Sequence, residues 1–468
     1  MVKENKTKVV CTIGPATNNY PVLKKLVEGG MDVARINLCH ADFSNRIEII
    51  NNITRINQEL NTNVAIMCDT KGAKIRTGDF INGEITLKKG DYLQITKKEV
   101  LGNSSLISLN MPKVIDSLNE GDKILIDDGL IILKVISKEK DSLNTLVLNS
   151  GTIKSKRGVN FPGVKLNIPF LSDDDYCDLE FITLNKVDFI SLSFVNNSED
   201  IKTVREYFQQ RGKNIKIIAK IETKTALKDL TNIIKEADGV MVARGDLGLE
   251  IDMALIPIIQ KEIIKKVREQ GKMVIVATEM LASMYNQPRP TRAELTDISN
   301  AIYDGTDAVM LSGETTFGTH PLEALKYMVD ICKVTENYVD FNGKYKNISH
   351  DLITDHVTES MVDISQKLKA KLILVISKDG NLPKIISNLK PNANILALCF
   401  NHQTARHLAL NYGVYTEIVN SSNNDVDIFN KMIFKLKALS KLKKNDIIIV
   451  SGSSKEEVTS FLKVIKIK

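Results

Sequence analysis

Residues 215–246 read IKIIAKIETKTALKDLTNIIKEADGVMVARGD and hold two short apolar runs around an amphipathic segment. The runs Ile215–Ile221 and Gly239–Val242 are bounded by polar and turn residues, which is typical of short buried strands. The segment between them has the length and apolar spacing of a helix. Strand, helix and strand in this order predict a parallel β-α-β unit.

The same alternation extends to both sides of this stretch. Arg46–Leu60 has isoleucines at helical spacing, and Ser172 with three following aspartates is typical of a helix start. Eight β-α units in about 240 residues predict an α/β fold, the (β/α)8 TIM barrel. The expected strands are Lys8–Ile13, Asp32–Asn37, Val64–Asp69, Phe189–Phe194, Ile215–Ile221, Gly239–Val242, Met273–Ala277 and Ala308–Leu311.

The alternation stops between Gly72 and Asn167, where no helix-length pattern occurs. Strand-like runs and tight turns here predict a small inserted β-barrel domain. These runs are Glu84–Leu87, Tyr92–Ile95, Lys123–Ile126, Ile131–Val135 and Thr145–Leu148. Because the insertion joins the barrel at only two points, we expect it to move as a lid.

A second α/β block follows the polar stretch Asn342–Asn347, which suits a linker. Its strands are expected at Leu372–Ile376, Ile395–Leu398, Val414–Ile418 and Ile447–Val450, which predicts a doubly wound domain. The expected domains are residues 1–71 with 168–339 for the catalytic barrel, 72–167 for the lid and 340–468 for the C-terminal domain.

Composition narrows the class of protein. The 468 residues are 43% hydrophobic and 26% charged, which excludes a disordered or fibrous chain. The six cysteines form no CxxC pair, so neither a disulfide framework nor a zinc site is expected. We therefore expect a reducing, cytoplasmic compartment, with no signal peptide and no membrane span. The net charge of +6 is small for this length and does not favour a nucleic-acid partner.

Charged residues follow several of the predicted barrel strands at their carboxyl ends, where barrel enzymes hold their catalytic groups. Arg35, Arg76 and Lys220 suit a substrate that carries both phosphate and carboxylate. Glu222 and Asp246 could share one Mg²⁺, with the substrate supplying other oxygens. Cations around such a metal indicate phosphoryl transfer.

Five motifs give a family resemblance: Thr12–Pro15, Lys71-Gly72, Met241–Gly248, Pro288–Glu294 and Met310–Thr315. In this order along nearly the whole chain, they resemble pyruvate kinase. The resemblance implies transfer of a phosphoryl group from phosphoenolpyruvate to ADP, giving pyruvate and ATP, the last step of glycolysis. It also implies a homotetramer.

The resemblance further implies roles for individual residues. Arg35 and Lys220 would bind phosphoenolpyruvate, and Thr278 would complete its pocket near the face where the enolate is protonated. The backbone of Ala243, Arg244, Gly245 and Asp246 would hold the substrate carboxylate. Glu222 and Asp246 would bind Mg²⁺. Arg76 and Arg157 would contact the transferring phosphoryl group and ATP, and the expected nucleotide-binding residues are Asn37, His40, Arg76 and Arg157. The expected catalytic residues are Lys220, Arg35, Arg76 and Thr278.

The monovalent-cation position departs from the commoner pattern of this family. Asn37, Asp69 and Thr70 match the usual K⁺ ligands, but Cys39 stands at the usual serine and Lys74 at the usual glutamate. One interpretation is that the Lys74 ammonium replaces K⁺, which makes K⁺ dispensable. The alternative is that Lys74 turns to solvent and K⁺ binds weakly.

Two loops of the C-terminal domain also differ from those of allosteric pyruvate kinases. Allosteric pyruvate kinases often bind a sugar phosphate on loops of the C-terminal domain. Here Asp379 puts a carboxylate where a hydroxyl would meet the phosphate, and the later loop Ser451–Glu457 is acidic. We therefore expect little activation by fructose 1,6-bisphosphate.

Several of these residues could instead have purely structural roles. Lys220 could be a solvated strand end, Glu222 and Asp246 could cap helices, and His40 could make a structural hydrogen bond. Arg292 and Glu294 are expected to tie a loop to the barrel, and the pair Asp127-Asp128 to form a tight turn.

Two other function classes remain open at this point. A barrel lyase or mutase would share the metal carboxylates but would not need a lid with Arg157. A non-catalytic scaffold would have lost Lys220, Glu222 or Asp246, and all three are present.

Overall fold

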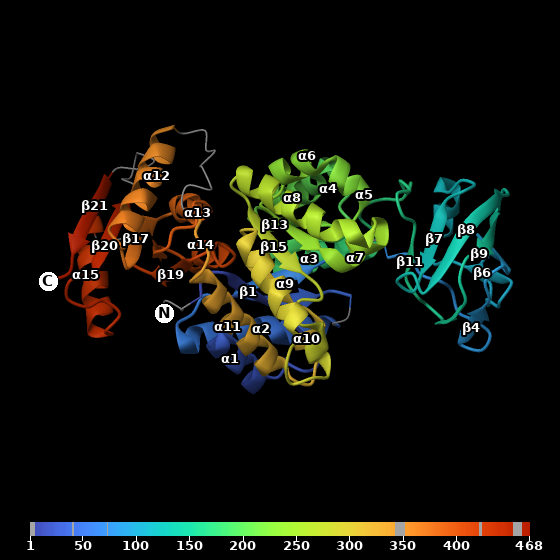
Figure 1. The fold of residues 1–468 in the computed structure, drawn as a ribbon, viewed down its shortest axis with the longest axis horizontal. Helices are drawn as coiled ribbons and strands as arrows, with labels where there is room; N and C mark the ends of the chain where they lie inside the picture. Colours follow the sequence, from blue (N-terminus) through green and yellow to red (C-terminus); the bar gives the residue numbers. More distant parts are fainter. Residues whose placement is uncertain (1–4, 40–41, 73, 342–351, 421–423, 453–460) are drawn as a thin grey trace.

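The protein has three parts arranged in a row. A computed structural model describes all residues except 1–4, 40–41, 73, 342–351, 421–423 and 453–460. The inserted domain lies at one end, the barrel in the middle and the C-terminal domain at the other end (Figure 1). The expected linker at 342–347 lies outside the described residues.

Eight parallel strands close into the central barrel, so the TIM-barrel prediction is confirmed. Around the barrel the order is β1-β2-β3-β12-β13-β14-β15-β16. The strands are β1 (Lys8–Ile13), β2 (Val33–Asn37), β3 (Ala65–Asp69), β12 (Phe189–Leu192), β13 (Lys216–Ile221), β14 (Gly239–Ala243), β15 (Met273–Ala277) and β16 (Ala308–Leu311). Nearly every strand residue is buried, because side chains fill the barrel on one face and helices cover the other.

Helices surround the barrel and pack their apolar faces on its strands. Helix α3 begins as the sequence predicts: Ser172 accepts from the Asp175 amide, and Asp175 accepts from the Ser172 amide in return. The barrel helices are α1 (Tyr20–Gly29), α2 (Phe43–Leu60), α3 (Asp173–Leu184), α4 (Ser198–Gln210), α5 (Lys224–Lys228), α6 (Leu230–Glu236), α7 (Arg244–Glu250), α8 (Ile256–Glu269), α9 (Arg292–Tyr303), α10 (Gly313–Thr316) and α11 (Pro321–Glu336). Short 3₁₀ helices span Met253–Leu255 and Ala282–Tyr285.

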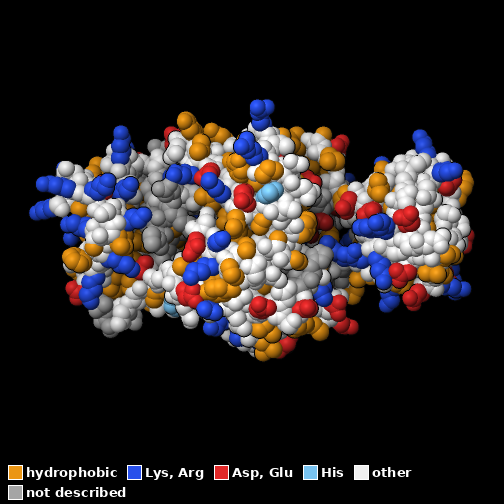
Figure 2. Space-filling model, turned by 90° about the horizontal axis from the view of Figure 1, so that it is seen from below, with side chains coloured by type: hydrophobic (Ala, Val, Ile, Leu, Met, Phe, Trp, Pro, Cys, Tyr) orange, Lys and Arg blue, Asp and Glu red, His pale blue; other side chains and the backbone are white. Residues whose placement is uncertain are grey.

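The inserted domain divides its strands between a six-stranded and a two-stranded sheet around one apolar core. The small barrel expected from the sequence is thus split into two sheets. The strands are β4 (Glu84–Leu87), β5 (Tyr92–Thr96), β6 (Leu106–Ser108), β7 (Lys123–Ile126), β8 (Ile131–Lys138), β9 (Ser142–Val147), β10 (Gly151–Lys154) and β11 (Val159–Asn160), with a 3₁₀ helix at Pro112–Ser117. Figure 2 shows this domain as a lobe set apart from the barrel.

The C-terminal domain is a five-stranded sheet with helices packed on it. Its order is β19-β18-β17-β20-β21, and the first four strands run parallel as expected. The fifth, β21, pairs antiparallel with β20 and was not expected. The elements are α12 (Leu352–Lys367), β17 (Leu372–Ser377), α13 (Asn381–Asn388), β18 (Asn394–Cys399), α14 (His402–His407), β19 (Val414–Ile418), α15 (Asp425–Ala438), β20 (Ile447–Gly452) and β21 (Phe461–Lys466).

Within the part of the chain that the structure describes, no helix combines the length and the apolar character that a transmembrane span requires.

Candidate active site

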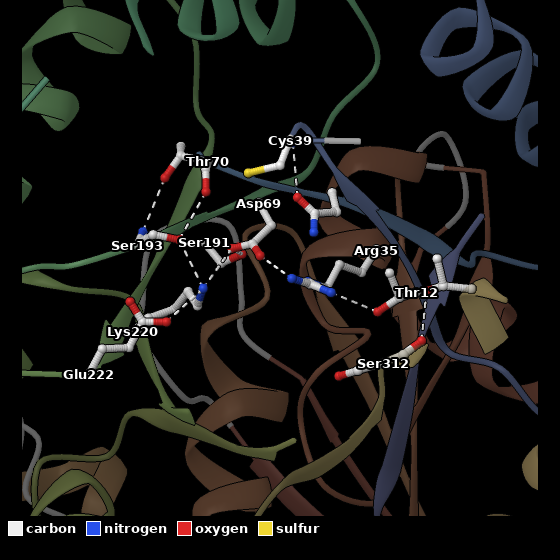
Figure 3. Close-up of polar contacts among 12 residues, drawn as sticks. Thr12, Arg35, Cys39, Asp69, Thr70, Ser191, Ser193, Lys220, Glu222 and Ser312 are labelled. Atoms are coloured by element: carbon white, nitrogen blue, oxygen red, sulfur yellow. Dashed lines mark hydrogen bonds and ion pairs between the residues drawn. The ribbon is translucent and has the colours of Figure 1, made fainter. Parts of the chain in front are cut away.

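Four charged side chains meet at the carboxyl ends of neighbouring barrel strands (Figure 3). Asp69 at the end of β3 is ion-paired to Arg35 of β2 and lies 3.5 Å from Lys220 Nζ of β13. Lys220 Nζ also lies 2.8 Å from Glu222 Oε1. All four side chains are buried, so two cations and two carboxylates neutralise one another in a site largely closed to water.

Hydroxyl groups hold these charges in place, and the sequence analysis missed them. Lys220 Nζ donates to Ser193 Oγ at 2.8 Å, and Ser191 Oγ donates to Asp69 Oδ1 at 2.7 Å. Arg35 Nη1 donates to Thr12 Oγ1 at 2.8 Å. A signal was available: Ser191 and Ser193 stand two residues apart at the end of an apolar strand, so both point to the same side.

The surroundings of Lys220 keep it charged. Burial alone would lower its pKa, but Asp69 and Glu222 raise that pKa above its ordinary value. Burial likewise favours neutral Asp69, yet Arg35 and Lys220 lower the pKa of Asp69 to about 2. Burial raises the pKa of Glu222 against the pull of Lys220, and the neighbouring Asp246 raises it further. The site therefore holds a permanent cation between carboxylates.

The predicted carboxylate cradle lies where β14 passes into α7. The Gly245 amide donates to Thr278 Oγ1 at 2.9 Å, so the structure brings Thr278 and this turn together. Thr278 has a positive φ of 69°, an unusual conformation for a β-branched residue. The Arg244 side chain points elsewhere: Nη1 donates to Asp297 at 2.7 Å and Nη2 to the Thr278 carbonyl at 2.6 Å. Only the backbone of Arg244 is left for a substrate.

A cleft of about 490 Å³ separates the inserted domain from the barrel. Arg76, Arg157 and Asp246 line it, as does Lys74. Arg76 Nη1 donates to the Lys156 carbonyl at 2.9 Å, which holds Arg76 beside the loop that carries Arg157. Arg35, Lys220, Glu222 and Thr278 are not among the residues that line this cleft.

Two acidic residues of the lid also line the cleft, Asp127 and Asp128. Both have a φ of 54°, and the Leu130 amide donates to the Asp127 carbonyl, so they form the tight turn that the sequence predicts. Burial raises the pKa of Asp128, and the charge of Asp246 raises it further, so the turn of the lid lies near Asp246 of the barrel. The turn is predictable from the sequence, but its position beside Asp246 is not.

The residues predicted for a monovalent cation lie at and just after the ends of β2 and β3. Asn37 Oδ1 accepts from the Cys39 amide at 3.0 Å, and Thr70 Oγ1 accepts from the Ser193 amide at 3.1 Å. Burial raises the pKa of the Cys39 thiol, and the positive charges of Lys74, Lys220 and Lys71 oppose that rise. The Lys74 side chain is exposed and also lines the cleft beneath the lid. His40 lies outside the described residues.

The loop after β15 is tied to the barrel by Glu294. Its carboxylate accepts from the Ser283 amide at 2.7 Å and from the Thr291 amide at 2.7 Å. Glu314, fully buried, accepts from the amides of Leu281 and Ser312 in a similar way. These carboxylates are structural. Among the described residues no group of three or more Asp, Glu, His or Cys is spaced to hold a metal ion.

Comparison with known proteins decides the family. The family model "Pyruvate kinase, barrel domain" matches residues 4–325, and "Pyruvate kinase, alpha/beta domain" matches residues 355–467. The chain belongs to the pyruvate kinase family. It therefore is an enzyme, a kinase that transfers the phosphoryl group of phosphoenolpyruvate to ADP in the last step of glycolysis.

Individual pyruvate kinases match over most of their length. The chain is 43% identical to the enzyme of Geobacillus stearothermophilus over 91% of this chain and 74% of that one. It is 38% identical to the enzyme of Clostridium perfringens over 99% of both. A crystal structure of a pyruvate kinase from Cryptosporidium parvum superposes with a TM-score of 0.94 at 35% identity, covering 100% of this chain and 97% of that chain.

Proposed function

We propose that the cluster of Arg35, Asp69, Lys220 and Glu222 is the phosphoryl-transfer site of this pyruvate kinase. The observation that carries the proposal is a buried lysine whose pKa is raised by two carboxylates, beside a buried arginine. Fixed cations in a site closed to water stabilise the charge that develops as a phosphoryl group moves, and they need no rearrangement to do so.

Glu222 and Asp246 fit a Mg²⁺ ion. Both are carboxylates, which magnesium prefers; burial raises the pKa of Glu222, and the nearby charge of Asp246 raises it further. Two protein carboxylates leave coordination positions for phosphate oxygens and water, as in other phosphoryl-transfer sites. When bound, the ion would neutralise charge on the transferring phosphoryl group.

Residues of the chain bind phosphoenolpyruvate and stabilise the enolate. Arg35 and Lys220 bind the phosphoryl group of phosphoenolpyruvate, and Lys220 neutralises the enolate that remains after transfer. The backbone of residues 243–246 holds the substrate carboxylate, with the Gly245 amide shared between that carboxylate and Thr278 Oγ1. Thr278 borders the face of the enolate that receives a proton, where its hydroxyl orients the proton donor.

Arg76 and Arg157 bind the nucleotide in the cleft beneath the lid, with Asn37 and His40 at its edge. We assign residues 72–167 to the lid, 1–71 with 168–339 to the barrel and 340–468 to the C-terminal domain. Gly72 at the first junction has a φ of 62°, and a Cβ there would meet the Phe194 ring at 2.8 Å, so this hinge position requires glycine. Closure of the lid would exclude water during transfer.

K⁺ is dispensable in this proposal. The effect of Lys74 on Cys39 supports an ammonium at the monovalent-cation position, and a thiol is a poor ligand for a hard cation. A lysine charge here also repels a second cation, since two unit charges 4 Å apart cost about 4 kcal/mol at an effective dielectric of 20.

The enzyme is further proposed to be a cytoplasmic homotetramer with little response to fructose 1,6-bisphosphate. The Asp379 carboxylate accepts from the Asn381 amide at 2.9 Å and from Asn381 Nδ2 at 2.6 Å, which fixes a negative charge in the loop where a phosphate would bind. Most of the later loop, from residue 453, lies outside the described residues.

A coupled assay for pyruvate tests the proposed site. Mg²⁺-dependent pyruvate formation from phosphoenolpyruvate should require ADP, and Glu222→Gln should raise the Mg²⁺ concentration needed for half-maximal rate. Pyruvate formed equally without ADP would indicate a lyase or phosphatase instead. No pyruvate from correctly folded protein would indicate a scaffold.

A further inference from the structure

Two consecutive residues in the loop after β15 have a left-handed backbone conformation. Thr278 has a φ of 69° and Glu279 a φ of 56°, and neither is a glycine. A side chain disfavours this region of φ, and a β-branched side chain such as that of threonine disfavours it most. Such a conformation persists only where neighbouring groups fix it, so the groups that contact this turn decide its shape.

The guanidinium of Arg244 contacts this turn at several points. Its Nε donates to the Ala277 carbonyl at 3.3 Å, its Nη2 donates to the Thr278 carbonyl at 2.6 Å, and Nη2 also lies 3.0 Å from Met280 Sδ. Among the described residues, Arg244 is the only hydrogen-bond donor to the Thr278 carbonyl. Because that carbonyl belongs to the planar peptide unit between Thr278 and Glu279, Arg244 fixes the orientation of the unit that joins the two left-handed residues.

A carboxylate on α9 holds the other edge of the same guanidinium. Arg244 Nη1 lies 2.7 Å from Asp297 Oδ1 and 2.6 Å from Asp297 Oδ2, and the Arg244 side chain is only 11% exposed. The guanidinium is planar and presents its N–H groups in a fixed fork. An ion pair on one edge therefore directs the other edge at the carbonyls of the turn.

The shape of the turn determines where the Thr278 hydroxyl lies. Thr278 Oγ1 accepts from the Gly245 amide at 2.9 Å and donates to the Ala277 carbonyl at 2.6 Å. These two bonds use the hydrogen and one of the two lone pairs of the hydroxyl. In the proposed function, the second lone pair is left to orient the proton donor beside the enolate. A rotation of Thr278 to a negative φ would move the hydroxyl away from Gly245 and from this position.

The contacts of Arg244 do not extend to the residues assigned to the phosphoryl group. Arg35 is paired with Asp69, and Lys220 lies between Asp69 and Glu222. Loss of the Arg244 side chain should therefore leave phosphoryl binding in place and affect the proton transfer that Thr278 serves.

We propose that Arg244 is a positioning residue for protonation of the enolate. Its guanidinium, held by Asp297, keeps Thr278 in the left-handed turn that places the hydroxyl beside the substrate. This inference rests on the proposed role of Thr278 and assigns the side chain of Arg244 a task separate from that of its backbone.

Exchange of the methyl hydrogens of pyruvate for deuterium measures the proton transfer by itself. In D₂O with Mg²⁺ and ATP, a methyl C–H bond breaks, the proton passes to solvent and a deuteron takes its place, which proton NMR follows as loss of the methyl signal. Arg244→Met should lower the exchange rate at least about tenfold, because misplacing a catalytic group by about 1 Å can cost about a hundredfold. KM for phosphoenolpyruvate should change less than about threefold, since the groups that bind it remain.

Arg205→Met is the matched control at the opposite end of the barrel. Arg205 Nη2 also bonds to a carboxylate and a carbonyl, Asp238 Oδ2 at 3.0 Å and the Glu236 oxygen at 2.6 Å, and this variant should exchange as wild type does. Asp297→Ala is a second test, which releases the Arg244 guanidinium without altering α7. Its position is 34% exposed, so the fold should be retained, and the exchange rate should fall in the same direction as in Arg244→Met.

A double variant tests whether Arg244 acts through Thr278. Arg244→Met/Thr278→Ala should exchange no more slowly than Thr278→Ala, because effects that share one pathway do not add. Two losses that multiply, or wild-type exchange in both Arg244→Met and Asp297→Ala, would overturn the inference. Wild-type exchange in Thr278→Ala would overturn both the proposed role of Thr278 and this inference.

A crystal structure of Arg244→Met tests the turn without any activity. We expect Thr278 to leave the positive φ region and its hydrogen bond with the Gly245 amide to be lost. An unchanged turn would overturn the inference even if the variant were inactive. A wild-type enzyme that forms no pyruvate would count against the proposed function, and this structure would then decide by itself whether Arg244 holds the turn.

Discussion

Two buried lysines lie at opposite ends of the barrel, and their environments shift their pKa values in opposite directions. Lys220, at the carboxyl end of β13, contacts both Asp69 and Glu222, and its pKa is raised. Lys390 lies 2.9 Å from Asp307 just before β16, but Arg268 shares that carboxylate at 3.1 Å. Burial lowers the pKa of Lys390 to about 7, and Asp307 opposes that shift only in part.

The difference is the number of carboxylates available to each cation. Two acids and two bases neutralise one another around Lys220, whereas Lys390 and Arg268 share the one carboxylate in contact with them, Asp307, and Glu336 adds only a weaker attraction to Lys390. Lys390 compensates through neutral partners: Nζ donates to the Thr306 carbonyl at 2.8 Å and lies 3.8 Å from the centre of the Tyr412 ring. The first arrangement suits charge stabilisation in a reaction, and the second joins the barrel to the C-terminal domain.

The largest effect is expected at the catalytic end. Lys220→Ala should lower turnover by about 10²–10³, because a fixed cation at developing charge is worth that much in rate. The coupled pyruvate assay measures the loss. The variant should still fold, because Arg35 continues to pair with Asp69, and a cooperative thermal unfolding transition checks this.

Lys390→Met is the matched variant at the other end and should retain near wild-type turnover. If Lys220→Ala kept more than about a tenth of wild-type turnover, the role of Lys220 would be wrong. If Lys390→Met lost as much activity as Lys220→Ala, the contrast between the two ends would disappear.

A smaller effect is expected from the hydroxyl that positions Lys220. Ser193→Ala removes the 2.8 Å hydrogen bond to Nζ, and a hydrogen bond worth about 0.5–1.5 kcal/mol corresponds to a roughly three- to tenfold loss in turnover. Ser193→Thr keeps the hydroxyl and should restore most of the rate. Equal loss in both variants would point to packing rather than positioning.

Much of the barrel could be predicted because its pattern is repetitive. Each strand is a short apolar run, and the helix start at Ser172 has a recognisable cap. Strand β21 was missed because its residues, Phe461–Lys466, include two lysines and lack a long apolar run, as is common for an edge strand. Strands β6 and β11 were missed because they have only three and two residues, and the four-residue strand β10 was missed because Gly151, Thr152 and Lys154 leave it a single large apolar side chain, Ile153.

The candidate site was predictable where its residues are charged and not where they are neutral. Arg35, Lys220 and Glu222 stand out at strand ends, but Ser193 gains meaning only when β12 and β13 lie side by side. The contacts among Arg268, Asp307 and Lys390 could not be predicted from the sequence for another reason. Arg268, Asp307 and Lys390 belong to different elements and two domains, and no local motif joins them.

At the monovalent-cation position we expect K⁺ to have only a small effect on turnover. K⁺ should raise wild-type turnover less than about threefold over a tetramethylammonium control at equal ionic strength, because Lys74 already supplies the charge. Lys74→Glu should acquire K⁺ dependence. Lys71→Glu in the same loop is a comparison that should not acquire it. A wild-type enzyme nearly inactive without K⁺ would contradict the proposal, whatever Lys74→Glu did.

The last prediction concerns stability rather than turnover, and it is a pH dependence at Lys390. Its pKa is about 7 in the folded chain, below the ordinary value of 10.5 for an unfolded one. Between these values the unfolded chain binds a proton that the folded chain does not, so Lys390 makes stability rise with pH. Below about pH 7 its full penalty is present, and above about pH 10.5 the penalty is gone.

Lys390→Met removes this titration while leaving the ion pair between Arg268 and Asp307. Between pH 7 and pH 9.5, the free energy of unfolding of wild type should therefore rise relative to that of Lys390→Met by on the order of 3 kcal/mol. The difference in Tm between the two proteins should change by a few degrees over the same range. Lys371→Met, at an exposed position, should follow wild type at every pH. Because Lys220 is held charged by two carboxylates, no variant at the catalytic end should reproduce this slope. A gap between wild type and Lys390→Met that stays constant over this range would show that Lys390 remains protonated when folded, and would make the two ends of the barrel alike.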